Sequence, residues 1–386
     1  MSTRVPKFDL NGTVPKILQV STRHNVGGIS KLIIELIGDS SFEQIYATGT
    51  CERNEMEYSL RLTPHSEDGY RFIRIPRLKR KISLVNDFLA LYSLIRIIRR
   101  EKPDIIHTHM SKAGLLGRIA ALLSLTRIKT VHSYHGHVLD GYFNQQLSQI
   151  FIKLEKILGR FTDAFIFDGK QTLLEIDKFG IKPKKVQEVI LPGLIKHGSN
   201  NTHNQLANTK LNILVVARIE KVKRIDLVLS VARNLTSNYP ELNYEITIVG
   251  DGALKHNFEK QSVDELLPIK FVGWSDSMNK YYEEADLLLS TSDAEGTPLA
   301  FMEAASFGCP IISTNVGSVA DLIDNHRTGI LCESNSEIIA KTILFLWEDR
   351  ALLERYSQNS FIKASNEFTA DKFISKHSQL YKSLLP

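Results

Sequence analysis

The chain has 386 residues, of which 43% are hydrophobic and 24% are charged, and its formal net charge is +5. This length allows two domains that each bury a core, and the composition excludes a disordered or fibrous protein. The small positive charge is too weak to indicate a nucleic-acid partner.

The N-terminal segment 1–16 has no apolar core, so we do not expect a secretory signal. No run approaches the roughly 18 apolar residues of a membrane span. The cysteines, Cys51, Cys309 and Cys332, are odd in number and far apart, which favours a reducing compartment. We therefore expect a cytoplasmic protein.

From residue 16 onward, short β-branched apolar runs alternate with amphipathic helical stretches. The strands expected in the first half are 16–21, 44–49, 71–76, 104–109, 129–135 and 163–168. The helices expected there are 29–38, 82–101, 112–124, 145–160 and 170–178. Such alternation predicts a parallel sheet with helices on both faces.

Segment 192–212 is rich in Gly, Ser, Asn and Thr, which is typical of a linker. The alternation then restarts. The strands expected in the second half are 212–218, 244–250, 269–274, 286–291 and 310–315, and the helices are 224–237, 253–262, 277–284, 298–307, 336–348 and 371–386. Two α/β domains in tandem are predicted, with ligands beyond the carboxyl ends of the strands and in a cleft between the domains.

Gly27 and Gly28 lie where the first strand gives way to a helix. Small residues there let a backbone approach an anion, and the helix offers free N–H groups. A simple tight turn is the more common explanation for such a pair. No P-loop or complete dinucleotide-binding motif is present.

Arg218 and Lys223 lie at a strand-to-helix turn in the second half. Arg by its fork geometry and Lys as a point charge suit a diphosphate. The alternative is a solvated charged run, because the local sequence is "EKVKR".

The segment "STSDAEGTPLAFMEAASFGCP" at 290–310 places Glu295 in a loop and Glu303 inside an apolar helix. Pro298 suits the first position of that helix, whose free N–H groups near 297–300 favour a phosphate. The two carboxylates can then accept hydrogen bonds from ligand hydroxyls. A half-exposed helical position explains Glu303 as well.

Histidines occur as "HTH" (His107 and His109) and "HSYHGH" (His132, His135 and His137). Strand alternation puts His107 and His109 on one face. A polar wall is the simpler interpretation, and a metal site is the alternative. His135 ends a strand, where it can bond a substrate hydroxyl or stabilise developing charge.

Taken together and in order, these segments resemble retaining GT-B glycosyltransferases of family 4, which build bacterial surface polysaccharides and lipid-linked oligosaccharides. The most specific segment is E-G-x-P-x-x-x-x-E, and the next is the spacing of five between Arg218 and Lys223. The resemblance implies a GT-B fold, α/β with two Rossmann-like domains that face each other across a cleft. It implies an acceptor-binding domain at 1–195, a nucleotide-sugar domain at 196–370, and a helix at 371–386 that crosses back.

The resemblance also implies residue roles. Arg218 and Lys223 match the pair on the donor diphosphate, Glu303 matches the ribose-binding glutamate, and Glu295 and His135 match residues beside the transferred sugar. The phosphate-facing helix start corresponds to Gly296, Thr297, Pro298 and Leu299, and the N-terminal loop glycines correspond to Gly27 and Gly28.

Two departures from the family pattern concern turn shape. Arg224 stands where a glycine usually follows the lysine, and Ala217 stands where a glycine often precedes the arginine.

We expect displacement of a nucleoside diphosphate, UDP by resemblance, from an anomeric carbon with retention. The chain has no Asp-x-Asp, so Arg218, Lys223 and the helix dipole would replace a metal ion, and no cofactor is expected. A nucleotide-sugar epimerase of the same fold, or a sugar-nucleotide-binding protein without turnover, remains an alternative.

The acceptor is expected to be a saccharide or a polyprenyl-linked saccharide. Segment 77–102 pairs an apolar helix with Arg and Lys at both ends. The simpler interpretation is a core helix with charged ends, and the alternative is a contact with anionic lipid at the inner face of the membrane.

Overall fold

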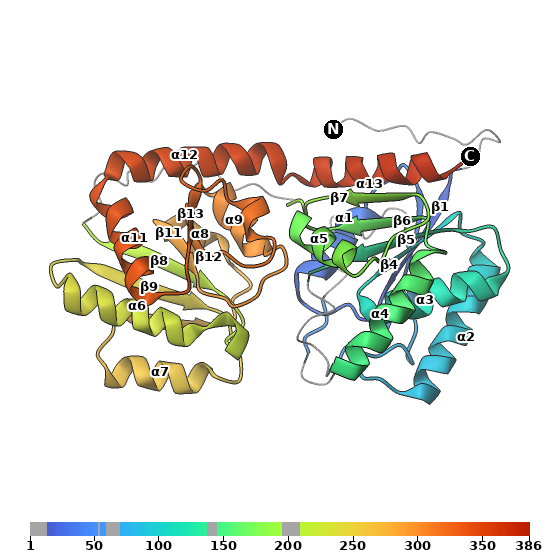
Figure 1. The fold of residues 1–386 in the computed structure, drawn as a ribbon, viewed down its shortest axis with the longest axis horizontal. Coiled ribbons are helices and arrows are strands. Elements are labelled where there is room, and N and C mark those ends of the chain that lie inside the picture. Colours follow the sequence, from blue (N-terminus) through green and yellow to red (C-terminus); the bar gives the residue numbers. More distant parts are fainter. Residues whose placement is uncertain (1–13, 53–54, 59–69, 137–144, 195–208) are drawn as a thin grey trace. The chain divides into compact units, whose positions relative to one another are not determined.

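The computed structural model describes residues 14–52, 55–58, 70–136, 145–194 and 209–386. It divides into two compact units, which Figure 1 shows. Unit 1 comprises Met1–Gly193 and Ala370–Pro386, and unit 2 comprises Leu194–Thr369. Histidine 137 and most of the expected linker lie outside the described residues.

The described part of unit 1 contains a seven-stranded sheet in the order β3-β2-β1-β4-β5-β6-β7, and every neighbouring pair is parallel. Its strands are β1 (Lys16–Ser21), β2 (Glu43–Thr48), β3 (Tyr70–Arg74), β4 (Ile105–His109), β5 (Lys129–Tyr134), β6 (Ala164–Phe167) and β7 (Val186–Val189). Its helices are α1 (Gly28–Ile37), α2 (Leu84–Glu101), α3 (Ser111–Ser124), α4 (Gln145–Gly159), α5 (Lys170–Lys178) and α13 (Ala370–Leu384).

Side chains of β1 alternate between two faces of this sheet. Leu18 and Val20 pack into a core shared with α2 and α3. Gln19 points to the other face, where its side chain meets Tyr381 of α13. His107 and His109 of β4 lie on that same face with ring centroids 4.1 Å apart, as strand alternation predicts.

The described part of unit 2 contains a six-stranded parallel sheet in the order β10-β9-β8-β11-β12-β13. Its strands are β8 (Leu211–Val216), β9 (Tyr244–Val249), β10 (Ile269–Gly273), β11 (Leu287–Ser290), β12 (Ile311–Thr314) and β13 (Gly329–Cys332). Its helices are α6 (Ile225–Asn238), α7 (Lys255–Asp264), α8 (Asn279–Glu284), α9 (Leu299–Ser306), α10 (Val319–Leu322), α11 (Ser336–Glu348) and α12 (Arg350–Glu367), and a 3₁₀ turn spans Lys221–Lys223. A core of β-branched and leucine side chains from β8, β9, β11, α6 and α11 holds these layers together.

Every expected strand and helix is present to within two residues at each end. The sequence did not predict β7, β13, α10 or α12. The β7 segment VQEV has only four residues and does not alternate apolar and polar residues, and it pairs with β6 at the end of the sheet. Helix α12, RALLERYSQNSFIKASNE, has no strong apolar face.

Both sheets reverse their strand order at one point, between β1 and β4 in unit 1 and between β8 and β11 in unit 2. Loops that leave neighbouring strands at such a point diverge to opposite faces of the sheet and leave a crevice in which ligands bind. Most of the residues singled out from the sequence belong to or follow these strands, and His135 follows β5, the neighbour of β4.

Candidate functional site

Two loops of unit 2 meet at its switch point, one after β8 and one after β11. Lys223 Nζ lies 2.6 Å from Glu295 Oε1, although 72 residues separate them. Both side chains are largely buried, with 18% and 11% of their surface exposed. Ser292 Oγ donates a second hydrogen bond to the same Glu295 oxygen at 2.6 Å. Among the described residues, no donor contacts Glu295 Oε2.

Further bonds tie these two loops together. Thr291 Oγ1 donates to the carbonyl oxygens of Lys223 and Arg224 at 3.1 and 3.0 Å. The backbone N–H of Asp293 donates to the Val222 carbonyl at 2.9 Å. The position of Lys223 relative to Glu295 is therefore set by the backbone as well as by their ion pair.

Arg224 has φ 50° and ψ 48° and precedes α6. This left-handed conformation is the one that glycine adopts without strain, which explains why the related pattern has glycine there. Here Arg224 ion-pairs with Asp226 at 3.0 Å and with Asp293 at 2.9 Å, across the two loops. These bonds offset the cost of the conformation.

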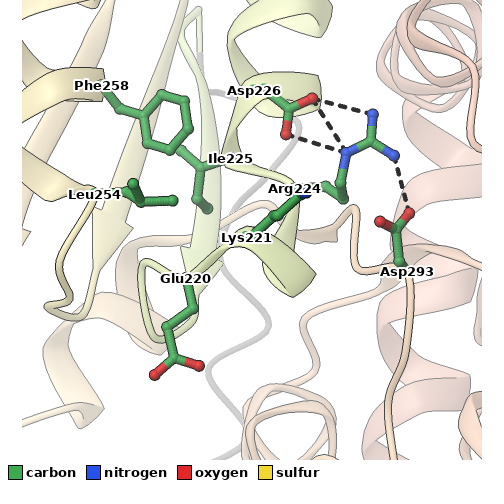
Figure 2. A pocket seen from close by; sticks show the side chains of 8 residues that line it. All are labelled: Glu220, Lys221, Arg224, Ile225, Asp226, Leu254, Phe258 and Asp293. Carbon is green, nitrogen blue, oxygen red and sulfur yellow. Dashed lines mark hydrogen bonds and ion pairs between the residues drawn. The ribbon is translucent and has the colours of Figure 1, made fainter. Parts of the chain in front are cut away.

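A cavity of about 400 Å³ lies beside the Lys223–Glu295 pair and not at it. Figure 2 shows Leu254, Ile225 and Phe258 along one part of its wall and the Arg224 ion pairs along another. Glu220 and Lys221 complete the lining. The cavity shows that the turn after β8 is hollowed, but none of the residues predicted to bind a ligand line it.

Glu303 lies in the second turn of α9 and is partly buried, between buried Met302 and Ala304. The Tyr282 hydroxyl of α8 donates to Glu303 Oε2 at 2.8 Å. Burial and the Glu303 carboxylate raise the pKa of Tyr282 well above its usual value, so this hydroxyl stays protonated. Tyr282 therefore fixes one oxygen of Glu303.

Helix α9 begins one residue later than predicted. Pro298 is the extended N-cap residue, with ψ 118°, and the first helical residue is Leu299. The cap makes no side-chain hydrogen bond, so the first N–H groups of α9 are not capped by a side chain. Gly296 and Thr297 lie in the partly buried loop between Glu295 and this helix end.

Arg218 follows β8 but does not join the cluster. Its side chain is 69% exposed and its Nη1 lies 3.0 Å from Glu220 Oε1. The structure thus brings Lys223 and Glu295 into contact, and leaves Arg218 on the surface of the same unit.

Gly27, Gly28 and His135 belong to unit 1 and follow strands of its sheet. Gly27 is the N-cap residue of α1 and Gly28 is the first residue of that helix. A Cβ placed on Gly27 would meet only Asn25 Nδ2 at 3.7 Å, an ordinary contact, so packing does not require glycine there.

Both ring nitrogens of His135 have partners. Nδ1 lies 2.7 Å from Asp168 Oδ2, and Nε2 lies 3.1 Å from His109 Nδ1. His109 and His107 are bonded in turn to Gln19, Tyr381 and Ser133. Among the described residues, no three His, Cys, Asp or Glu side chains are grouped so that they could hold a metal ion.

Sequence reasoning missed four contributors: Tyr282, Ser292, Asp168 and Gly317. Asp168 ends an expected strand, and Ser292 and Gly317 follow expected strands, so their position was a usable signal. Gly317 has φ 54°, and a Cβ there would come within 1.7 Å of the Glu295 carbonyl oxygen. Tyr282 carries no such signal, since only the fold brings it from α8 to Glu303.

Comparison with known proteins matches two family models to consecutive parts of the chain. Residues 44–193 match the model described as Glycosyltransferase Family 4, and residues 199–362 match the one described as Glycosyl transferases group 1.

Among relatives, a UDP-Gal:alpha-D-GlcNAc-diphosphoundecaprenol alpha-1,3-galactosyltransferase of Escherichia coli is 28% identical over 83% of this chain and 86% of its own. The capsular polysaccharide biosynthesis glycosyltransferase CapM of Staphylococcus aureus is 24% identical over 80% of this chain and 84% of its own. Among solved structures, HepE of Anabaena in complex with UDP has a TM-score of 0.77 at 17% identity, over 95% of this chain and 100% of the other. This last similarity concerns the fold.

The close approach of Gly317 to Glu295 generates a stability prediction. Gly317→Ala adds a left-handed alanine and a backbone clash, so we expect it to destabilise unit 2 by about 2–4 kcal/mol. Both tryptophans, Trp274 and Trp347, lie in unit 2, so urea unfolding followed by tryptophan fluorescence measures this unit.

Gly273→Ala is the matched control. Gly273 also has a positive φ, 82°, but its Cβ would meet only the flexible end of Lys255 at 3.1 Å. We expect Gly273→Ala to lower the free energy of unfolding only through the left-handed backbone conformation, by about 1 kcal/mol. Equal urea midpoints for the two variants would contradict the steric role of Gly317.

Proposed function

Because this chain belongs to glycosyltransferase family 4 and has the GT-B fold, we propose that it transfers a sugar from a UDP-sugar to a lipid-linked saccharide. The acceptor is proposed to be joined through diphosphate to a polyprenyl chain, as in the name of the E. coli relative. The product would be a unit of O-antigen or capsular polysaccharide, the pathways named for other relatives. Enzymes of this family retain the anomeric configuration and need no metal ion.

The observation that carries this proposal is the Lys223–Glu295 contact of 2.6 Å at the switch point of unit 2. It places a cation and a carboxylate where a parallel sheet of this type binds ligands. A lysine ammonium has three donor protons, so it can bond a phosphate oxygen and keep Glu295.

The leaving diphosphate is proposed to bind Lys223, Arg218 and the start of α9. Arg218 is exposed and can offer its planar fork to a phosphate. The uncapped N–H groups after Pro298 add a partial positive charge. Together these groups would stabilise the negative charge that develops on the leaving UDP.

The two glutamates are proposed to recognise hydroxyl groups. Glu295 Oε1 is taken by Lys223 and Ser292, which leaves Oε2 for a sugar hydroxyl. Glu303, oriented by Tyr282, would accept from the ribose. In this proposal the two glutamates are not the acid–base pair of a glycoside hydrolase, because the two carboxylates of such a pair flank the glycosidic bond that is cleaved.

In unit 1, Gly27 and Gly28 are proposed to lie near the diphosphate, and His135 near the sugar. The open space at Gly27 is consistent with a close backbone approach by a ligand. His135 has both nitrogens bonded, so a ligand would have to replace His109 at Nε2.

The reaction is proposed to proceed on one face of the sugar. The acceptor oxygen forms a bond to the anomeric carbon while the bond from that carbon to the phosphate oxygen breaks. The departing phosphate takes the acceptor's proton, so no side chain is needed as a base. Because the acceptor oxygen attacks the anomeric carbon directly, no side chain of the protein forms a covalent intermediate.

The sequence left helix 77–102 open between a core helix and a membrane contact. Within the described residues, no helix is long and apolar enough to cross a membrane. The second half of α2 is core, with Leu94, Ile97 and Ile98 buried. The N-terminal end of α2 is not, since Leu84, Val85 and Phe88 are 86%, 71% and 69% exposed.

Exposed basic residues immediately precede this apolar surface: Arg77, Lys79, Arg80 and Lys81. An apolar helix face beside a cluster of positive charges is typical of peripheral contact with anionic lipid. We propose that this part of unit 1 meets the inner face of the membrane, where a polyprenyl-linked acceptor is held.

The function is tested with a panel of UDP-sugars, with and without a polyprenyl-diphosphate-linked saccharide. We expect UDP release and a product one sugar heavier only when the acceptor is present, and equal rates with EDTA. Conversion of a UDP-sugar without acceptor would instead identify an epimerase, and binding without turnover would identify a sugar-nucleotide-binding protein.

In the same assay we expect Lys223→Ala and Arg218→Ala to lower kcat about 100- to 1,000-fold, because each removes a positive charge from the leaving group. Lys221→Ala is the control, since Lys221 lies in the same turn and carries the same charge but is not placed on the diphosphate. Near-normal kcat in Lys223→Ala or Arg218→Ala would exclude that residue from the proposed role.

The membrane contact is tested by co-sedimentation with phosphatidylglycerol vesicles. Each basic residue near the surface contributes about 1 kcal/mol. Glutamine at 77, 79, 80 and 81 should therefore lower binding more than about tenfold. Phe88→Asp should also weaken it, whereas Ile362→Asp, at another exposed apolar residue, should not. Binding that none of these changes affects would exclude this surface.

A further inference from the structure

A continuous run of hydrogen bonds connects His135 to the last helix of unit 1. It starts at Asp168, whose Oδ2 lies 2.7 Å from His135 Nδ1. His135 Nε2 lies 3.1 Å from His109 Nδ1. His109 Nε2 lies 2.9 Å from Gln19 Oε1. His109 and Gln19 are fully buried, so these bonds are shielded from water.

The run continues through α13. Gln19 Nε2 lies 3.3 Å from the Tyr381 hydroxyl, which lies 2.6 Å from His107 Nδ1. His107 Nε2 lies 2.7 Å from Ser133 Oγ. We call the whole run the relay. Strand register places Gln19 of β1 opposite His107 of β4, so the sheet itself aligns it.

Within the relay, His107 and His109 are neutral near pH 7. Burial, and then the neighbouring histidines, lower the pKa of His107 and of His109 well below the ordinary value. Each of these rings therefore carries one N–H, and its other nitrogen can only accept a hydrogen bond. Burial also raises the pKa of Tyr381, so its hydroxyl keeps its proton.

The Gln19 amide sets the direction of every bond. Its Oε1 can only accept, so His109 must donate from Nε2. His109 Nδ1 then has no proton and accepts from His135 Nε2. Toward the other end, Gln19 Nε2 donates to Tyr381, Tyr381 donates to His107 Nδ1, and His107 Nε2 donates to Ser133.

His135 consequently donates at both nitrogens. The Asp168 carboxylate accepts from Nδ1, and His109 accepts from Nε2. An imidazole with two N–H groups is a cation, and Asp168 balances its charge.

We propose that Gln19, His109 and Tyr381 are positioning residues that hold His135 in its doubly protonated form, so that it meets its ligand as a cationic hydrogen-bond donor. This inference rests on the proposed function in placing His135 beside the sugar nucleotide. A ligand oxygen that replaces His109 at Nε2 would receive a charge-assisted hydrogen bond. His135 cannot serve as the base for the acceptor hydroxyl, because it has no unprotonated nitrogen.

Other titratable groups surround the relay. His377 of α13 lies 5.9 Å from His107 between ring centroids, and burial lowers the pKa of His377 to about 4. His132 of β5 is also buried, and burial lowers its pKa well below the ordinary value. Asp39 is hydrogen-bonded by Ser378 of α13. His377 and His132 therefore add no positive charge to the relay at pH 7.

The test is ¹⁵N NMR of the full chain labelled at histidine, with the His135 signals assigned by their loss in His135→Gln. At pH 7 we expect both ring nitrogens of His135 to be protonated and His109 to be protonated only at Nε2. An unprotonated Nε2 on His135 would overturn the proposal, since the relay would then run in the opposite direction. This readout needs no substrate, so it is independent of the proposed function.

Two substitutions of Gln19 distinguish its effect on the direction of the hydrogen bonds from its effect on packing. Gln19→Leu removes the oxygen that forces His109 to donate from Nε2, so we expect His135 to lose its Nε2 proton at pH 7. Gln19→Glu keeps an oxygen toward His109, so we expect both protons to remain. The same His135 signals in the two variants would contradict control by Gln19.

Tyr381→Phe tests the α13 end, and Ser378→Ala is its control because it removes a different hydrogen bond of α13, to Asp39. We expect Tyr381→Phe, but not Ser378→Ala, to change the His109 and His135 signals and to lower kcat/KM about tenfold, as for an unsatisfied buried partner. Equal effects of Tyr381→Phe and Ser378→Ala would show that α13 acts only by packing against the sheet and not through the Tyr381 hydrogen bonds. If His135 and His109 give the expected NMR signals but the protein has no transferase activity, the proposed function is wrong and the proposal about His135 is not.

Discussion

Lys223 and Glu295 hold each other at 2.6 Å where the strand order of unit 2 reverses, and the candidate site depends on this contact. Either charge alone would be costly in a largely buried position, and the pair offsets that cost. Because parallel strands end at one edge, residues 72 positions apart arrive there together. Thr291, Arg224 and Asp293 then fix the two loops, so the charges are in place before any ligand arrives.

The architecture was predictable because its main determinants are local. Apolar runs of period two and helices of period 3.6 alternate along the chain, and each expected element is present to within two residues. The elements missed were those whose sequence carries little pattern. Strand β7 is short, and α12 has no strong apolar face, so tertiary packing rather than periodicity decides both.

The site was predictable only in part. Position after a strand indicated Lys223, Glu295 and His135, since function concentrates at those ends. The same criterion does not reach a partner that lies inside a helix, such as Tyr282 of α8. Tyr282 reaches Glu303 from another helix, and nothing in its local sequence distinguishes it from the neighbouring tyrosine.

Helix α2 shows a different limit of sequence patterns. Its periodicity is that of a packed helix, yet only the part from Ala90 onward packs into the core shared with α3 and the sheet. The pattern defines an apolar face and does not say what lies against it. Arg224 departs from the family pattern, which has glycine at this position. It nevertheless keeps the left-handed turn, through ion pairs to Asp226 and Asp293.

Helix α13 has a consequence for biosynthesis. Gln19 and Tyr381 touch although 362 positions separate them. All of unit 2 is translated between those two residues. A nascent chain can form the first sheet early, but the buried amide of Gln19 must wait for its tyrosine. The N-terminal unit therefore completes its interior only after the other unit has emerged from the ribosome, the reverse of the usual order for domains made in sequence.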